Sequence, residues 1–129
     1  MGANAEYVRR WIEALNRRDI DALVEDASPD FEWVVAREHP DATTHRGIDA
    51  TVEYLREWLR LMPDFHVGTE EIEEHGDQVL TVIRLTGSGA GSGASTEVRT
   101  AMLSTFRDGV PVRTEEFLDP EEARAALAG

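Results

Sequence analysis

Apolar residues recur at helical spacing in the first half of the chain, and this pattern gives way to a strand-like one in the second half. Val8, Trp11 and Leu15 lie three or four positions apart, which predicts a helix that begins after Asn4 as its N-cap. Asp19 is placed to cap a second helix. The Ser-Pro-Asp sequence that follows should end this helix, because the residue before a proline avoids the helical region.

A third helix is predicted further along, since Ile48, Val52 and Leu55 share one helical face and a proline closes the pattern. Ahead of it, residues 31–36 form a short run typical of a strand. Residues 37–47 contain two histidines, a proline and several Asp and Thr residues. This composition predicts a loop.

The second half of the chain is predicted to form strands. Two short segments, His75-Gly76-Asp77 and Arg107-Asp108-Gly109, have the composition of tight turns, so the strands on either side of each should pair antiparallel. The predicted strands cover residues 65–74, 78–86, 96–107 and 110–118.

A last helix is predicted at the end, where Asp119 is an N-cap, Pro120 takes the first helical position, and residues 123–129 continue the helix. Helices that precede a meander of strands predict an α+β fold rather than a doubly wound parallel sheet. Without an internal repeat or a linker, residues 1–129 are expected to form one domain. The glycine-rich residues 87–95 lack the lysine and the strand-to-helix setting of a phosphate loop, so we read them as a hairpin connection.

The charge of the chain limits the classes of partner that we expect it to bind. The net charge is −13, and all 13 basic residues are arginines. Such an acidic surface repels phosphate backbones and anionic lipids, so we expect neither a nucleic acid nor a membrane as partner. The sequence has no cysteine, and its first residues lack the basic and apolar stretches of a signal peptide, so a cytoplasmic protein is expected.

The order of these elements and several short motifs resemble the SnoaL-like branch of the nuclear-transport-factor-2-like superfamily. The resemblance implies a cone-shaped fold, in which three N-terminal helices wrap a curved antiparallel or mixed sheet around an apolar pocket, with a short C-terminal helix and a homodimer formed through the sheet. The segments that carry the resemblance are residues 14–23, 29–33, 46–47, 63–65, 76–77, 106–109 and 116–119.

Two catalytic patterns of this superfamily are incomplete in the chain. The positions that match the tyrosine, the carboxylate base and the protonated acid of ketosteroid isomerases hold Trp11, Val35 and Met102. These apolar residues argue against a standard ketosteroid isomerase. Arg84 could match the arginine of limonene-epoxide-hydrolase-like members, but Thr86 stands where the nearby acid is expected.

A third pattern is retained, because Glu116 matches the acid/base carboxylate that SnoaL-like cyclases carry on the last strand. Strand alternation places it on one face with Val112 and Thr114. A carboxylate among apolar neighbours on a concave face is suited to general acid–base catalysis. The alternative is a structural ion pair with an arginine such as Arg84, Arg99 or Arg113.

Three histidines are candidates for proton transfer or for metal binding. His66 opens a predicted strand and is a candidate proton-transfer partner of Glu116, with a solvent-facing strand end as the alternative. His39, Asp41 and His45 imitate a two-histidine, one-carboxylate metal site. A proline and the short spacing fit poorly with convergence on one metal ion, so no metal is predicted.

The sequence thus predicts a protein that binds a small hydrophobic, polyketide- or terpenoid-like molecule, with no cofactor. It would be a cyclase, isomerase or hydrolase in which Glu116 acts as acid and base. The alternatives are a non-catalytic ligand-binding domain and a dimeric assembly domain. The residues predicted to contact the ligand are Trp11, Trp33, Val35, Tyr54, Arg84, Met102 and Phe106.

Overall fold

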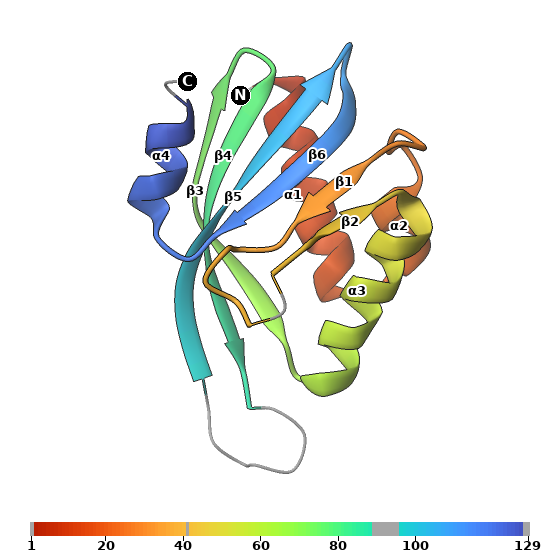
Figure 1. The fold of residues 1–129 in the computed structure, drawn as a ribbon, viewed down its shortest axis with the longest axis vertical. Coiled ribbons are helices and arrows are strands. Elements are labelled where there is room, and N and C mark those ends of the chain that lie inside the picture. The colour runs from red at the N-terminus through yellow and green to blue at the C-terminus, as the bar shows by residue number, and fades with distance from the viewer. Residues whose placement is uncertain (1, 41, 89–95, 128–129) are drawn as a thin grey trace.

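The computed structural model describes residues 2–40, 42–88 and 96–127, which form a six-stranded sheet and four helices. Figure 1 shows the first three helices on one side of the sheet and the last helix on the other. The helices are α1 (Ala3–Asn16), α2 (Ile20–Val24), α3 (Ile48–Leu61) and α4 (Pro120–Leu127). The strands are β1 (Glu32–Val34), β2 (Thr44–Arg46), β3 (His66–His75), β4 (Gln78–Gly87), β5 (Thr96–Arg107) and β6 (Val110–Phe117).

The strands follow the order β2-β1-β6-β5-β4-β3 across the sheet. β1 and β6 are parallel, and the other neighbouring pairs are antiparallel. The sheet is therefore mixed, and the predicted α+β fold is confirmed. The tight turns are also confirmed, since Gly76, Asp108 and Gly109 have the positive φ angles of 60°, 52° and 79° that such turns require.

Successive side chains of a strand point to opposite faces of the sheet, so the apolar residues form two separate clusters. The larger cluster lies between the inner face of the sheet and helices α1 to α3, and it includes Leu15, Trp33 and Met102. The smaller one lies on the outer face, where Ala123 of α4 packs against Leu80 and Ala101. The inner face is thus the one that the three N-terminal helices cover.

The predicted N-cap of the first helix is wrong. α1 begins at Ala3 after Gly2, which makes no side-chain cap hydrogen bond. The carboxylate of Glu74 on β3 instead accepts a hydrogen bond of 2.8 Å from the backbone N–H of Ala5. A distant acidic side chain therefore satisfies the helix start, and its negative charge also suits the positive end of the helix dipole.

The other two predicted caps are confirmed. The Asp19 side chain accepts a hydrogen bond of 3.2 Å from the N–H of Ala22 at the start of α2. Asp119 accepts one of 3.0 Å from the N–H of Glu121 at the start of α4.

The loop predicted at residues 37–47 is only partly correct, because it contains β2. This strand has three residues and pairs with β1 alone, at the edge of the sheet. Three residues are too few to show the alternation of apolar and polar positions from which a strand is predicted. The predicted connection at 87–95 lies outside the described residues from position 89 onward. No helix in the described ranges is long and apolar enough to cross a membrane.

Candidate acid–base and ligand site

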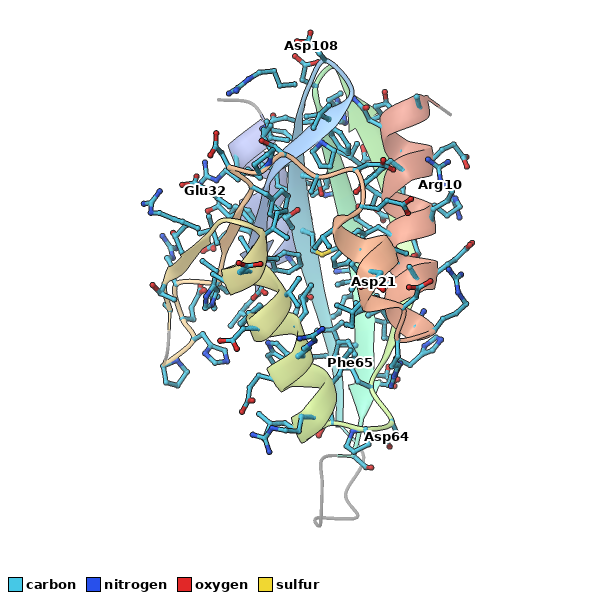
Figure 2. The ribbon with its side chains drawn as sticks, turned by 90° about the vertical axis from the view of Figure 1, so that its right-hand side faces the viewer. Arg10, Asp21, Glu32, Asp64, Phe65 and Asp108 are labelled. Atoms are coloured by element: carbon cyan, nitrogen blue, oxygen red, sulfur yellow. The ribbon has the colours of Figure 1, made fainter. Side chains whose placement is uncertain are left out.

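A cavity of about 510 Å³ lies between the inner face of the sheet and helices α1 and α3. Its strand wall is built by alternate residues, Ile83 and Leu85 on β4 and Val98 and Thr100 on β5, because every second side chain of a strand points to the same face. In Figure 2, Phe65 lies between α3 and α1 in front of the sheet, whereas Arg10 points away from α1. A second cavity of about 30 Å³ is lined in part by Tyr7 and Phe106.

Five aromatic rings follow one another along the helical wall of the large cavity. Trp11 of α1 stacks on Trp33 of β1 with 5.6 Å between ring centroids, and Trp33 lies 5.9 Å from Tyr54 of α3. Tyr54 then contacts Trp58 at 6.5 Å, and Trp58 contacts Phe65 at 6.0 Å. These distances lie in the range of favourable ring pairs, so the rings form a continuous aromatic arc from Trp11 to Phe65.

Glu116 of β6 lines the same cavity, and its carboxylate is held by the middle of the aromatic arc. Its Oε2 accepts a hydrogen bond of 2.5 Å from Nε1 of Trp33 and another of 2.7 Å from the hydroxyl of Tyr54. Its Oε1 lies 3.5 Å from the backbone nitrogen of Ala36. Two strong donors thus converge on one oxygen, and the other keeps most of its capacity to accept.

The sheet register explains how these groups meet. Met102 and Glu116 are direct partners across β5 and β6, so both side chains point to the inner face. The parallel pairing of β1 with β6 places Trp33 beside Thr114, two residues before Glu116. α3 packs against β1 and β2, and its Tyr54 reaches Glu116 from there.

The protonation state of Tyr54 fixes the direction of its hydrogen bond. Burial, followed by the charge of Glu116, raises the pKa of the Tyr54 phenol well above its usual value. Tyr54 is therefore a neutral phenol whose hydroxyl donates a hydrogen bond to Glu116. The indole N–H of Trp33 can only donate, so both residues act as donors to the carboxylate.

Glu116 has no cationic partner in the part of the chain that the structure describes. The arginines considered as structural partners pair elsewhere: Arg84 contacts Glu70 and Glu97, and Arg99 contacts Glu70. The remaining titratable residue in the described lining, beside Glu116 and Tyr54, is His39. The negative charge in the cavity is thus stabilised by neutral donors and not by an ion pair.

The structure brings together some of the predicted site residues and separates others. Trp11, Trp33, Tyr54, Met102 and Glu116 all line the large cavity. Phe106 lines the small one. The other three do not line either cavity: Val35 is buried in the main cluster, His66 is exposed at the start of β3, and Arg84 is exposed on the outer face.

Several lining residues were not predicted, namely Phe65, Ile83, Leu85, Val98 and Thr100. The signal that could have found those on β4 and β5 is alternation with Arg84 and Arg99, which point to the other face. The described residues form no cluster suited to hold a metal ion. His39 packs against Trp58, His45 stacks on Tyr54 at 4.6 Å, and Asp41 lies outside the described residues.

Comparisons with known proteins agree with this architecture. The sequence model of the SnoaL-like domain matches residues 8–114. An uncharacterized protein of Mycobacterium tuberculosis is 32% identical over 117 residues, which cover 89% of this chain and 88% of that protein.

Two solved structures share the fold. One, from Jannaschia, is named as a SnoaL-like polyketide cyclase; it has a TM-score of 0.81 and 23% identity over 98% of this chain and 92% of its own. The other is TerC co-crystallized with polyporic acid, with a TM-score of 0.80 and 21% identity over 99% of this chain and 100% of its own.

Proposed function

This chain belongs to the SnoaL-like domain family, and we propose that it binds a small hydrophobic molecule in the large cavity and moves a proton on it through Glu116, without a cofactor. The observation that carries this proposal is the position of the Glu116 carboxylate, inside an apolar cavity with Oε2 fixed by Trp33 and Tyr54. A base must be held in one orientation to meet its substrate, and these two donors supply that orientation.

The proposed step is proton abstraction next to a carbonyl group of the ligand. Oε1 of Glu116 takes the proton, and the electron pair of the broken C–H bond moves into the carbonyl to form an enolate. Where the enolate is conjugated with a C=C bond, Glu116 returns the proton to the far carbon, and the result is an isomerisation. Where the enolate carbon attacks a second carbonyl, a C–C bond closes the ring and the alkoxide that forms takes the proton back from Glu116. Trp33 and Tyr54 are positioning residues in this step, because both act through Glu116.

Two similar structures are consistent with a ligand of this kind. One is named as a polyketide cyclase and the other was crystallized with polyporic acid. Both are under 25% identical to this chain, so they support the fold alone, and the chemistry rests on Glu116.

A second candidate function is ligand binding without turnover. It is favoured by the three positions that match the isomerase groups, since they hold Trp11, Val35 and Met102, none of which can transfer a proton. Under this alternative Glu116 would contribute to affinity alone.

We also propose that residues 1–129 form one cytoplasmic domain and that this domain dimerises through the outer face of the sheet. Sedimentation of the purified chain would test the dimer.

The ligand site is tested by thermal unfolding with a panel of polycyclic ketones, quinones, terpenoid epoxides and fatty acids. A ligand at about 100 times its dissociation constant stabilises a fold by about 2.7 kcal/mol, which is readily measured. The matched variants are Val98→Trp, which would fill the cavity from a strand that lines it, and Val110→Trp at the β5–β6 turn. The two valines are similarly exposed, at 41% and 39%. Val98→Trp should abolish the stabilisation and Val110→Trp should retain it; equal stabilisation in both would contradict the site.

A further inference from the structure

The charge balance of the large cavity points to the kind of ligand that it accepts. Glu116 lines the cavity, and the described lining contains no arginine; His39 is the residue of that lining that could carry a positive charge, and it makes no ion pair with Glu116 that the structure shows. The chain contains no lysine at all. Charges that are removed from water without an ionic partner are unfavourable, so a ligand that brings the missing positive charge would be stabilised there.

The aromatic arc supplies a second attraction for a positive charge. Trp33 and Tyr54 both touch the carboxylate, and their rings contact Trp11 and Trp58 on either side. Trp33 and Tyr54 turn their N–H and O–H edges toward the carboxylate, and Trp11 and His45 stack on their faces. The ring attraction therefore acts on a cation that lies over a face of another ring of the arc, such as Trp58. Aromatic rings attract ammonium groups by about 0.5 to 2 kcal/mol, with more for desolvated sites, and tryptophan is the strongest of them.

The charge of the whole protein acts in the same direction. A net charge of −13 creates a potential that attracts cations and repels anions from every side. A carboxylate or phosphate in the ligand would meet both this field and the nearby charge of Glu116. Electrostatic repulsion therefore disfavours the binding of an anionic ligand, both at long range and beside Glu116.

We propose that the cavity recognises a hydrophobic organic cation, with a protonated or quaternary nitrogen beside Oε1 of Glu116 and an apolar body along the aromatic arc. This inference rests on the proposed use of the cavity as a ligand site and adds the chemical class of the ligand. It is compatible with proton transfer where the nitrogen is quaternary, because such a nitrogen has no N–H to compete for the carboxylate and makes the C–H bonds next to it more acidic. Glu116 can then hold the cation by charge and act on a neighbouring carbon.

The test compares three probes that share a naphthylmethyl body and differ in charge. They are (2-naphthylmethyl)trimethylammonium, its uncharged carbon isostere 2-neopentylnaphthalene, and the anion 2-naphthylacetate, and their dissociation constants are measured by calorimetry at fixed co-solvent. The cation should bind at least about tenfold more tightly than the carbon isostere, as ion pairing and ring contacts together predict. The anion should bind most weakly of the three.

Two variants separate the local charge from the overall charge. Glu116→Gln and Glu115→Gln each remove one negative charge, but Glu115 pairs with Arg113 and is not among the residues that line the cavity. The preference for the cation should fall severalfold in Glu116→Gln and persist in Glu115→Gln. It should also persist in high salt, because charges in a cavity are screened less than charges on the surface.

The outcomes distinguish this inference from the proposed function. Equal binding of the cation and its isostere would overturn the cation preference and leave the cavity as a ligand site. A preference that is lost equally in both variants would overturn the role of Glu116 in it. Binding of none of the probes would overturn this inference, and binding of a larger neutral ketone would then show that the proposed function survives.

Discussion

The hydroxyl oxygen of Tyr54 lies 2.7 Å from Oε2 of Glu116, across a sequence separation of 62 residues. This hydrogen bond joins the middle of α3 to the end of β6, so it ties the helical wall of the cavity to the sheet. Because Trp33 donates to the same oxygen, Oε2 is held by two strong donors, whereas Oε1 has only the long contact of 3.5 Å with the backbone nitrogen of Ala36. The proposed proton transfer by Glu116 depends on this arrangement.

Removal of the Tyr54 hydroxyl should lower the rate of proton transfer by Glu116 more than it lowers the stability of the fold. In Tyr54→Phe the carboxylate keeps Trp33 as a donor but loses the second hydrogen bond that fixes its orientation, so the rate of proton transfer should fall roughly tenfold. Ligand affinity should change much less. The measurement is the rate of proton exchange on a bound ketone under saturating ligand.

Tyr7→Phe is the matched control for that variant. Tyr7 lines the small cavity, and its ring packs edge-on against Phe106 at 5.6 Å, with no hydrogen bond to Glu116. Its exchange rate should equal that of the wild type. An equal loss in both variants would show that the effect of Tyr54 comes from packing.

The two tyrosines also predict how stability responds to alkaline pH. Burial, followed by the charge of Asp26, raises the pKa of Tyr7 to about 12, and the pKa of Tyr54 is raised further. In the unfolded chain both titrate near a pKa of about 10. Above that pH the unfolded chain releases these protons and the folded one retains them, so the free energy of unfolding should fall as the pH rises through the interval from about 10 to 12.

Denaturant unfolding at several alkaline pH values measures this slope. Each tyrosine contributes a loss of about 1.4 kcal/mol per pH unit within the interval. Tyr54→Phe should therefore show a shallower decline than the wild type. Tyrosinate absorbance that develops near pH 10 in the folded protein would contradict the burial of both phenols.

Asn16 is predicted to hold the start of β3 against the end of α1. Its amide donates to the carbonyl of Val67 at 2.9 Å and accepts from the N–H of the same residue at 2.9 Å. Asn16→Ala leaves both backbone groups without this partner, at a cost of about 2 kcal/mol. The midpoint of urea unfolding should fall while the slope stays the same.

Asn4→Ala is the control for Asn16 and also tests the corrected start of α1. Loss of a true N-cap costs about 1 kcal/mol, but the structure gives the cap position to Gly2. The variant should therefore unfold within about 0.5 kcal/mol of the wild type. A loss as large as that of Asn16→Ala would contradict both assignments.

The sequence predicted most of the fold because its strands and helices have clear periods and clear ends. The limits of β5, Thr96–Arg107, match the prediction, and the turns at Gly76 and Gly109 fix the hairpins. Elements that depend on distant partners were missed. β2 has only three residues, and the start of α1 is capped by Glu74 from 69 residues away.

The site was predicted in part, for related reasons. Alternation on β6 and the family resemblance identified Glu116, and the size of Trp33 and Tyr54 identified them as walls of a pocket. Their role as donors depends on contacts over 83 and 62 residues, which no local pattern encodes. Arg84 was predicted from the resemblance, although its alternation with Ile83 and Leu85 already indicated the outer face.

The most direct test of the central claim is solvent exchange at a carbon acid. The wild type, Glu116→Gln and Glu115→Gln are incubated with 2-tetralone in heavy water, and deuterium at the carbons beside the carbonyl is followed by NMR. Glutamine can still accept hydrogen bonds from Trp33 and Tyr54 but is a far weaker base, so Glu116→Gln should keep its stability and its affinity for the ketone. We predict that the wild type and Glu115→Gln accelerate exchange at least about a hundredfold over Glu116→Gln, as general base catalysis allows. Equal exchange in all three proteins, with the ketone bound, would contradict Glu116 as the base.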